Sequence, residues 1–127
     1  MNALSLKMLA IAAGASIGAL ARWAAGLWFN ASWPGFPLGT LLVNVAGGLM
    51  AGMALEWFGR TPDELLRLLI VTGFLGGLTT FSSFSGESLT LLQRGQFAMA
   101  LTHTSVHVLG SLAAAAAGLR LMQWWLD

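Results

Sequence analysis

Residues 73–85 read Gly-Phe-Leu-Gly-Gly-Leu-Thr-Thr-Phe-Ser-Ser-Phe-Ser, and they interrupt an apolar segment long enough to cross a lipid bilayer. Gly76-Gly77 and Thr79-Thr80 disfavour a regular helix, because glycine costs about 1 kcal/mol relative to alanine in a helix interior. Non-helical backbone at membrane depth persists only where protein covers it or where it lines a water-filled cavity. A helix break there also exposes carbonyls for a cation and amides for an anion. The sequence therefore predicts a broken helix near residues 76–80.

A second interpretation of the same glycines is close packing between helices. Gly73 and Gly77 have the GxxxG spacing that lets membrane helices approach one another, and the spacing recurs at 14–18 and 48–52. Spacing alone favours packing over a break, and the polar residues that follow the glycines are what favour the break.

The rest of the chain predicts three more membrane-spanning helices. Apolar segments run over about 4–29, 38–58, 65–92 and 97–126, each near or above the roughly 20 residues that a bilayer requires. Only 9% of the residues are charged, against about 25% in soluble domains. Six tryptophans lie near the predicted ends, as interfacial aromatic belts require: Trp23, Trp28, Trp33, Trp57, Trp124 and Trp125. We expect one all-α integral membrane domain over residues 1–127, with Thr61 before Pro62 as the N-cap of the third helix.

Composition excludes several classes of function. The absence of cysteine excludes disulfides and thiolate sites, and the net charge of +1 with a single lysine argues against nucleic-acid binding. No nucleophile has a base at a recognisable spacing, and no P-loop is present, so we expect neither an enzyme nor an organic cofactor.

The residues after the glycines combine aromatic rings with hydroxyl groups. Phe81 and Phe84 are three apart and would share a helix face, with Thr80, Ser82, Ser83 and Ser85 beside them. The edge of an aromatic ring is positive, so ring edges turned toward a pathway would steady an anion without a full charge that would trap it. Spacing alone is also compatible with ordinary core phenylalanines.

Four further polar residues lie within apolar segments. Asn44 could join helices or line a pore, and Arg22 could extend its charge to the membrane surface. His103 and His107 are four apart, a spacing that can hold a transition metal on one helix face. No carboxylate or cysteine is near them in sequence, so we favour hydrogen bonding within the bundle.

The 73–85 motif, Gly-Ala-Ser-Ile-Gly-Ala-Leu-Ala-Arg-Trp at 14–23 and Gly-Thr-Leu-Leu-Val-Asn at 39–44 together resemble the Fluc (CrcB) family of bacterial fluoride channels. The resemblance covers nearly the whole chain. It implies an antiparallel, dual-topology homodimer in the bacterial inner membrane that passively exports fluoride through two pores. It also implies a central structural sodium ion held by the main-chain carbonyls of Gly76 and Thr79.

Site residues follow from the resemblance by motif position. The pore would be lined by the ring edges of Phe81 and Phe84, the amide of Asn44, and the hydroxyls of Thr40, Ser83 and Ser111. Arg22 and Glu87 would lie at the vestibule, where an exposed, ionised Glu87 would repel an anion, so we expect it to be paired, protonated or turned aside.

The sequence leaves open two alternative functions and the orientation of the chain in the membrane. A small multidrug-type dual-topology transporter also has four helices, but it needs a carboxylate in the first span, which this chain lacks. A purely structural bundle would leave anion flux independent of Phe81 and Asn44. The side with both termini carries Lys7 and Arg60 and the other carries Arg94, so the positive-inside rule leans only weakly toward cytoplasmic termini.

Overall fold

The computed structural model describes residues 1–32 and 35–127, and within them lie four long helical stretches. The elements are α1 (Ala3–Phe29), α2 (Leu38–Arg60), α3 (Glu64–Arg67), the π-helix η1 (Leu68–Leu75), α4 (Gly76–Leu78), α5 (Phe81–Gln93) and α6 (Phe97–Leu126). The run from α3 to α5 forms one apolar stretch of 30 residues, Glu64–Gln93. The prediction of four long apolar helices, with the third interrupted, is confirmed.

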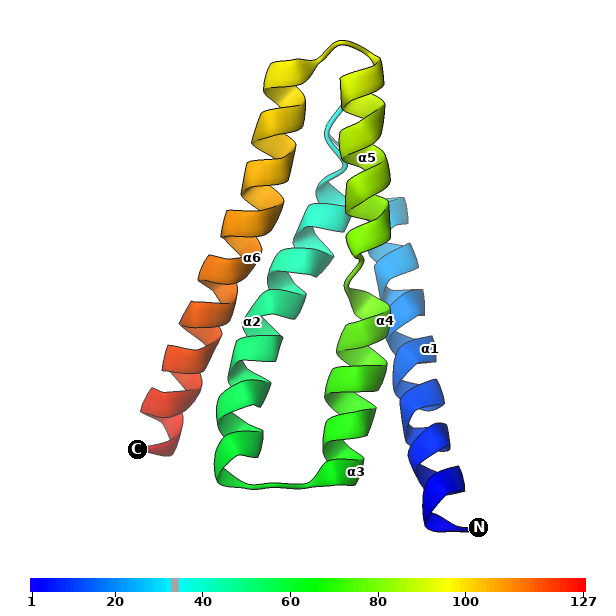
Figure 1. The fold of residues 1–127 in the computed structure, drawn as a ribbon, viewed down its shortest axis with the longest axis vertical. Coiled ribbons are helices and arrows are strands. Elements are labelled where there is room, and N and C mark those ends of the chain that lie inside the picture. The colour runs from blue at the N-terminus through cyan, green and yellow to red at the C-terminus, as the bar shows by residue number, and fades with distance from the viewer. Residues whose placement is uncertain (33–34) are drawn as a thin grey trace.

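The helices are arranged as two neighbouring pairs that meet toward one end of the molecule (Figure 1). α1 packs along η1 and α4, and α2 packs along α6. α5 continues past the interruption and contacts α6, to which the turn after Gln93 connects it. Both termini and the α2–α3 connection lie at the opposite end (Figure 1).

Glycines bring both pairs into backbone contact. In the first pair, a Cβ on Gly14 or Gly77 would collide with backbone atoms of η1 or with the Ala15 carbonyl of α1. In the second pair, a Cβ on Gly52 would collide with the Ala115 carbonyl. The glycines at the GxxxG spacings therefore do pack helices closely, and this packing occurs in the same segment as the helix break.

The break occupies a shorter segment than the sequence predicts. Gly76 and Gly77 are helical, and only Thr79 and Thr80 are extended, with φ/ψ of −83°/155° and −150°/116°. The preceding turn is widened, since the Gly76 amide bonds to the carbonyls of Gly73 and Val71. Such π-type turns are rare and often mark functional sites.

The predicted N-cap of the third helix is wrong by two residues. Thr61 instead ends α2, and its amide bonds to the Trp57 carbonyl. Asp63 is the N-cap, because its carboxylate accepts from the Leu66 amide at 3.0 Å and its charge suits the positive end of the helix.

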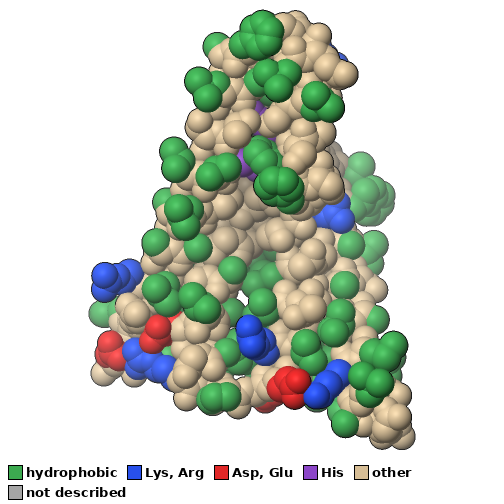
Figure 2. All heavy atoms as spheres, in the orientation of Figure 1, with side chains coloured by type: hydrophobic (Ala, Val, Ile, Leu, Met, Phe, Trp, Pro, Cys, Tyr) green, Lys and Arg blue, Asp and Glu red, His purple; other side chains and the backbone are tan. Residues whose placement is uncertain are grey.

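The surface fits a lipid environment. Large apolar side chains are exposed along the helices (Figure 2), and exposed tryptophans lie near the helix ends: Trp23, Trp28, Trp57, Trp124 and Trp125. Trp33, also assigned to an interface from the sequence, lies outside the described residues. Charged side chains gather at the end that carries the termini (Figure 2), where Lys7 pairs with Glu64 at 2.9 Å and Arg60 with Asp127 at 2.8 Å. The protein is a multi-pass membrane protein.

Candidate functional site

Two threonines shape the helix break with their own side chains. The Leu75 carbonyl accepts from both the amide and the hydroxyl of Thr79, at 3.0 and 2.8 Å, which closes the last turn before the break. Thr80 begins the next helix, since its hydroxyl accepts from the Ser83 amide at 3.1 Å. Both contacts satisfy polar groups that a helix end would otherwise leave unpaired.

Asn44 of α2 holds the extended backbone from across the bundle. Its Oδ1 accepts from the Thr80 amide at 2.8 Å, and its Nδ2 donates to the Thr80 carbonyl at 3.0 Å. In an unbroken helix the Thr80 amide would bond to the Gly76 carbonyl instead. The Gly76 carbonyl is thereby released from its usual partner, and the side-chain amide is fixed in one orientation.

Arg22 of α1 approaches the same break from the other side. Its Nε donates to the Gly77 carbonyl at 3.0 Å, and the side chain is half-buried. A cation at the carbonyl end of a helix interacts favourably with the helix dipole. Arg22 therefore stabilises one of the carbonyls that the break exposes.

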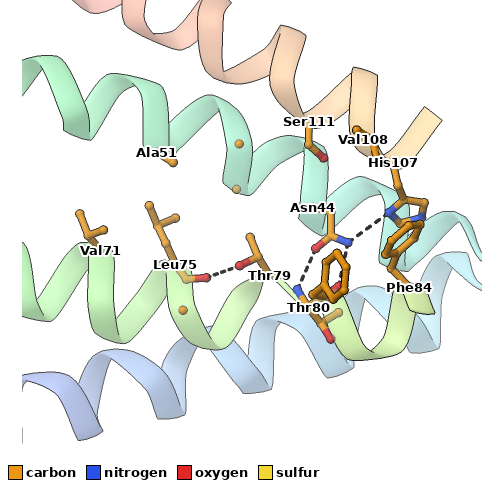
Figure 3. A pocket seen from close by; sticks show the side chains of 14 residues that line it. Asn44, Ala51, Val71, Leu75, Thr79, Thr80, Phe84, His107, Val108 and Ser111 are labelled. Carbon is orange, nitrogen blue, oxygen red and sulfur yellow. Dashed lines mark hydrogen bonds between the residues drawn. The ribbon is translucent and has the colours of Figure 1, made fainter. Parts of the chain in front are cut away.

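A groove of about 520 Å³ opens beside the break, between α2, η1, α4 and α6. Figure 3 shows Asn44, Thr79, Thr80, Phe84, His107 and Ser111 around it, and Figure 2 shows the hollow on this face of the molecule. The lining also includes Gly47, Gly48, Ala51, Val71, Leu75, Gly76, Phe81 and Val108. The groove is therefore mostly apolar, with a few polar groups concentrated at the break.

The two phenylalanines of α5 have very different environments. Phe84 is buried at 8% exposure, whereas Phe81 is 78% exposed, although both line the groove. Their rings meet edge to face, 5.4 Å apart at 65°. The Phe84 ring lies 4.7 Å from His107 and is stacked 5.5 Å from His103. The aromatic cluster thus runs from an exposed ring into the buried contact between α5 and α6.

His107 connects this cluster to Asn44. Its Nδ1 lies 3.1 Å from Asn44 Nδ2, and the side chain is buried at 4% exposure. Its Nε2 is buried and has no hydrogen-bond partner among the described residues, 1–32 and 35–127. A buried polar group without a partner costs about 1–3 kcal/mol. This nitrogen is the unsatisfied group of the site.

Glu87 lies just beyond His107 and is bonded on both oxygens. One oxygen accepts from the Thr40 hydroxyl at 2.7 Å, and the other lies 3.2 Å from Nε2 of the fully buried His103. Ser88 Oγ lies 2.7 Å from Nδ1 of the same histidine. Of the three states expected from the sequence (paired, protonated or turned aside), Glu87 is therefore in the paired one. It also lines a smaller cavity of about 230 Å³ together with Phe36 and Arg94.

The structure brings most of the sequence-predicted residues into one region and separates a few. Asn44, Phe81, Phe84, Ser111, Gly76 and Thr79 line the groove. Thr40 and Glu87 form their own pair deeper between the helices, and the Ser83 amide donates to the Thr80 hydroxyl that caps the start of α5. Arg22 binds the Gly77 carbonyl.

Sequence reasoning left His107 out of the site. A signal was present, because His103, His107 and Ser111 are four residues apart and so share one face of α6. Ser111 alone was taken from that face, on the strength of the family resemblance.

Comparisons with known proteins show the family that the chain resembles. Residues 9–119 match the family described as "CrcB-like protein, Camphor Resistance (CrcB)". The chain is 53% identical over 116 residues to the "Fluoride-specific ion channel FluC" of Bordetella petrii, which covers 90% of this chain and 89% of that protein. It is 50% identical to the protein of the same name from Tolumonas auensis, over 91% of this chain and 93% of that protein. The protein of that name from Pseudomonas paraeruginosa is also 50% identical, over 94% of this chain and 96% of its own length.

Proposed function

The chain belongs to the CrcB-like family of fluoride-specific ion channels, and we propose on that basis that it conducts fluoride passively across the cell membrane, out of the cytoplasm. It is an ion channel and not an enzyme. The observation that carries the proposal is the groove beside the helix break, where aromatic rings, hydroxyls and an imidazole meet exposed main chain at membrane depth. Close curated relatives over about nine-tenths of the chain supply the identity of the ion.

The lining suits an ion that must leave again. Fluoride holds its water tightly, so a pathway has to replace that shell with donors spread over several weak sites. We propose that the ion passes Phe81 and Phe84, the hydroxyls of Ser111 and Ser83, and then the Thr40–Glu87 pair. Asn44 lines the same path, although both of its N–H donors are engaged in this conformation.

A second copy of the chain is needed to complete the pore. Phe81 is 78% exposed, and Ser82 and Gly76 beside the break are exposed as well. Hydroxyls and main chain at membrane depth are costly against lipid, so this face calls for a protein partner. We propose an antiparallel homodimer in which the breaks of the two copies meet, with two pores.

The break also fits a structural sodium ion at the centre of that dimer. The Thr80 amide bonds to Asn44, so the Gly76 carbonyl has lost its helical partner, and the Thr79 carbonyl lies in extended backbone. Carbonyl oxygens at the end of a broken helix are typical sodium ligands. When bound, the ion would join the two copies electrostatically. In this arrangement Arg22 would draw anions toward a vestibule while it binds the Gly77 carbonyl.

Fluoride efflux from liposomes tests the proposal directly. Purified protein should release trapped fluoride and retain chloride. Phe84→Ile should slow fluoride release about tenfold, since an aromatic contact is worth about 0.5–1.5 kcal/mol beyond its buried area. Phe97→Ile is the matched control, because Phe97 is 68% exposed at the start of α6, away from the groove. Equal release of chloride and fluoride would contradict the proposal.

A further inference from the structure

We infer that Arg94 and Asn30 form an anion site in the small cavity beyond the Thr40–Glu87 pair, where they attract fluoride at the mouth of the pore. The inference rests on the proposed function and extends it to two residues that neither the sequence motif nor the relatives' names assign. The site combines the charge of one guanidinium with the N–H groups of one side-chain amide.

The cavity begins where the proposed path ends. It has a volume of about 230 Å³ and lies between the α1–α2 connection and α5, near the end of the bundle opposite the termini (Figure 1). Glu87 lines this cavity, and its carboxylate also accepts from the Thr40 hydroxyl at 2.7 Å. An ion that passes the Thr40–Glu87 pair would therefore enter this cavity next.

Arg94 brings an unpaired positive charge to the cavity. It is the C-cap of α5, it lines the cavity, and it is exposed to the surroundings. Its guanidinium has no ion pair or hydrogen bond among residues 1–32 and 35–127. A guanidinium keeps its charge at any working pH and offers five N–H donors. It is therefore able to bind a small anion.

The two charges of the cavity lie in a definite order. Glu87 and Arg94 are seven residues apart, which is about two helical turns or 10 Å along the axis, and they form no ion pair with each other. An anion in the cavity is repelled by the carboxylate and attracted by the guanidinium. Its favoured position is therefore at the exposed end of the cavity, from which it exchanges readily with water.

Asn30 adds neutral donors to the same cavity. Its Oδ1 accepts from the Thr40 amide at 3.2 Å, and a reversed amide would place donor against donor, so the contact assigns the oxygen. The two hydrogens on Nδ2 then have no partner within the described part of the chain, and the half-buried side chain lines the cavity. Such donors replace part of the water shell of fluoride.

A lipid anchor is the competing role for Arg94. Long basic side chains near helix ends extend their charge to the membrane surface. That role requires neither the cavity nor the donors of Asn30. Arg120 supplies the comparison, because it is exposed on α6 near the opposite end and lines neither the groove nor this cavity.

The charge at position 94 can be switched chemically, because the chain has no cysteine. Full-length Arg94→Cys is modified in detergent with a methanethiosulfonate reagent that carries either a trimethylammonium or a sulfonate group, and is then reconstituted into liposomes. Both adducts come from the same folded protein and differ chiefly in the sign of their charge. Arg120→Cys, treated in the same way, is the matched control.

We expect the cationic adduct at position 94 to release trapped fluoride about threefold faster than the anionic adduct at low ionic strength. This is less than the tenfold or more that a cleft lined by several like charges reaches. In about 1 M potassium gluconate the two rates should converge, because the Debye length falls to about 3 Å from about 30 Å at 0.01 M. The two Arg120→Cys adducts should release fluoride equally in both solutions.

Asn30→Asp tests the second member of the site. An aspartate still accepts from the Thr40 amide, so the contact that holds the start of α2 is kept, but the N–H donors are lost. Fluoride efflux should fall by up to about tenfold, since a hydrogen bond to a charged group is worth about that much. Unchanged efflux would remove Asn30 from the site.

The outcomes distinguish the inference from the function on which it rests. Equal rates for the two Arg94→Cys adducts at low ionic strength would overturn the inference and leave the channel standing. The same would follow from a difference that persists in concentrated salt, which would be steric, or from an equal difference at position 120, which would belong to the membrane surface. If the unchanged protein moves no fluoride, the proposed function itself fails.

Discussion

At the scale of single residues, the Asn44 side chain replaces the hydrogen-bond partners that the Thr80 backbone loses where the helix breaks. It pairs with both polar groups of Thr80 and still reaches His107, so three hydrogen bonds depend on one side chain. Its polarity within an apolar segment made it a candidate from the sequence alone. Its partners lie 36 and 63 residues away, and no local pattern shows such contacts.

Removing this amide should loosen the break before it affects the rest of the fold. Asn44→Ala leaves the Thr80 amide and carbonyl unpaired, which should lower the free energy of unfolding by about 1–3 kcal/mol. Hydrogen exchange should accelerate in peptides that cover residues 79–83. Asn2→Ala, which removes an exposed N-cap on α1, should leave exchange at the break unchanged. Uniform acceleration along the whole chain would argue against a local role for Asn44.

At the scale of the helices, the third apolar stretch shows that hydropathy predicts the existence of a helix break but not its position. Four long helices and an interruption of the third follow from apolar length and from the Gly-Thr-Ser composition. The position of the break does not, because Gly76 and Gly77 stay helical and the extended residues are Thr79 and Thr80. Both the glycine pair and the threonine pair are poor helix formers, so contacts with other helices determine which of them leaves the helix. α1 packs against Gly77, and Asn44 binds the extended backbone of Thr80.

The effect of a glycine-to-alanine substitution should depend on which atoms the added Cβ would meet. A Cβ on Gly77 would collide with the Ala15 carbonyl, so Gly77→Ala should force α1 and α4 apart and lower the free energy of unfolding by about 1–3 kcal/mol, the usual cost of overpacking. Gly59→Ala is the matched control, since a Cβ there meets nothing within 4 Å. Thermal unfolding in detergent compares the two variants. Equal midpoints for both would show that the helices can separate at little cost.

At the scale of the whole molecule, the sequence predicts the helical bundle well, but it predicts the contacts between distant residues of the site less well. The membrane-spanning fold and the family follow from composition and motif, because both depend on residues close together in sequence. The contacts of His107 do not, since they depend on α2, α5 and α6 meeting at one point. The exposed Phe81 marks the face on which we propose that a second, inverted copy packs.

Dual topology makes a whole-molecule prediction that labelling can check. The chain has no cysteine, so a single introduced one is unique. Thr61→Cys, in the connection after α2, and Gln96→Cys, at the opposite end, should each react with a membrane-impermeant thiol reagent in about half of the molecules, because opposite orientations insert when the positive-charge bias is weak. Permeabilised cells supply the fully labelled control. Full labelling of one variant with protection of the other would show a single orientation.

The end of the bundle that carries the termini is electrically balanced. It holds four basic and four acidic residues: Lys7, Arg60, Arg67 and Arg120 with Glu56, Asp63, Glu64 and Asp127. Lys7–Glu64 and Arg60–Asp127 are ion pairs across separate helices. Surface pairs of this kind contribute little to stability, with a median of about 0–1 kcal/mol, so selection on folding constrains them weakly. One or two charge changes there would therefore bias insertion while leaving the fold intact. In the antiparallel pair that we propose, such changes after a gene duplication would be enough to give two specialised chains, each inserted in its own direction in the membrane.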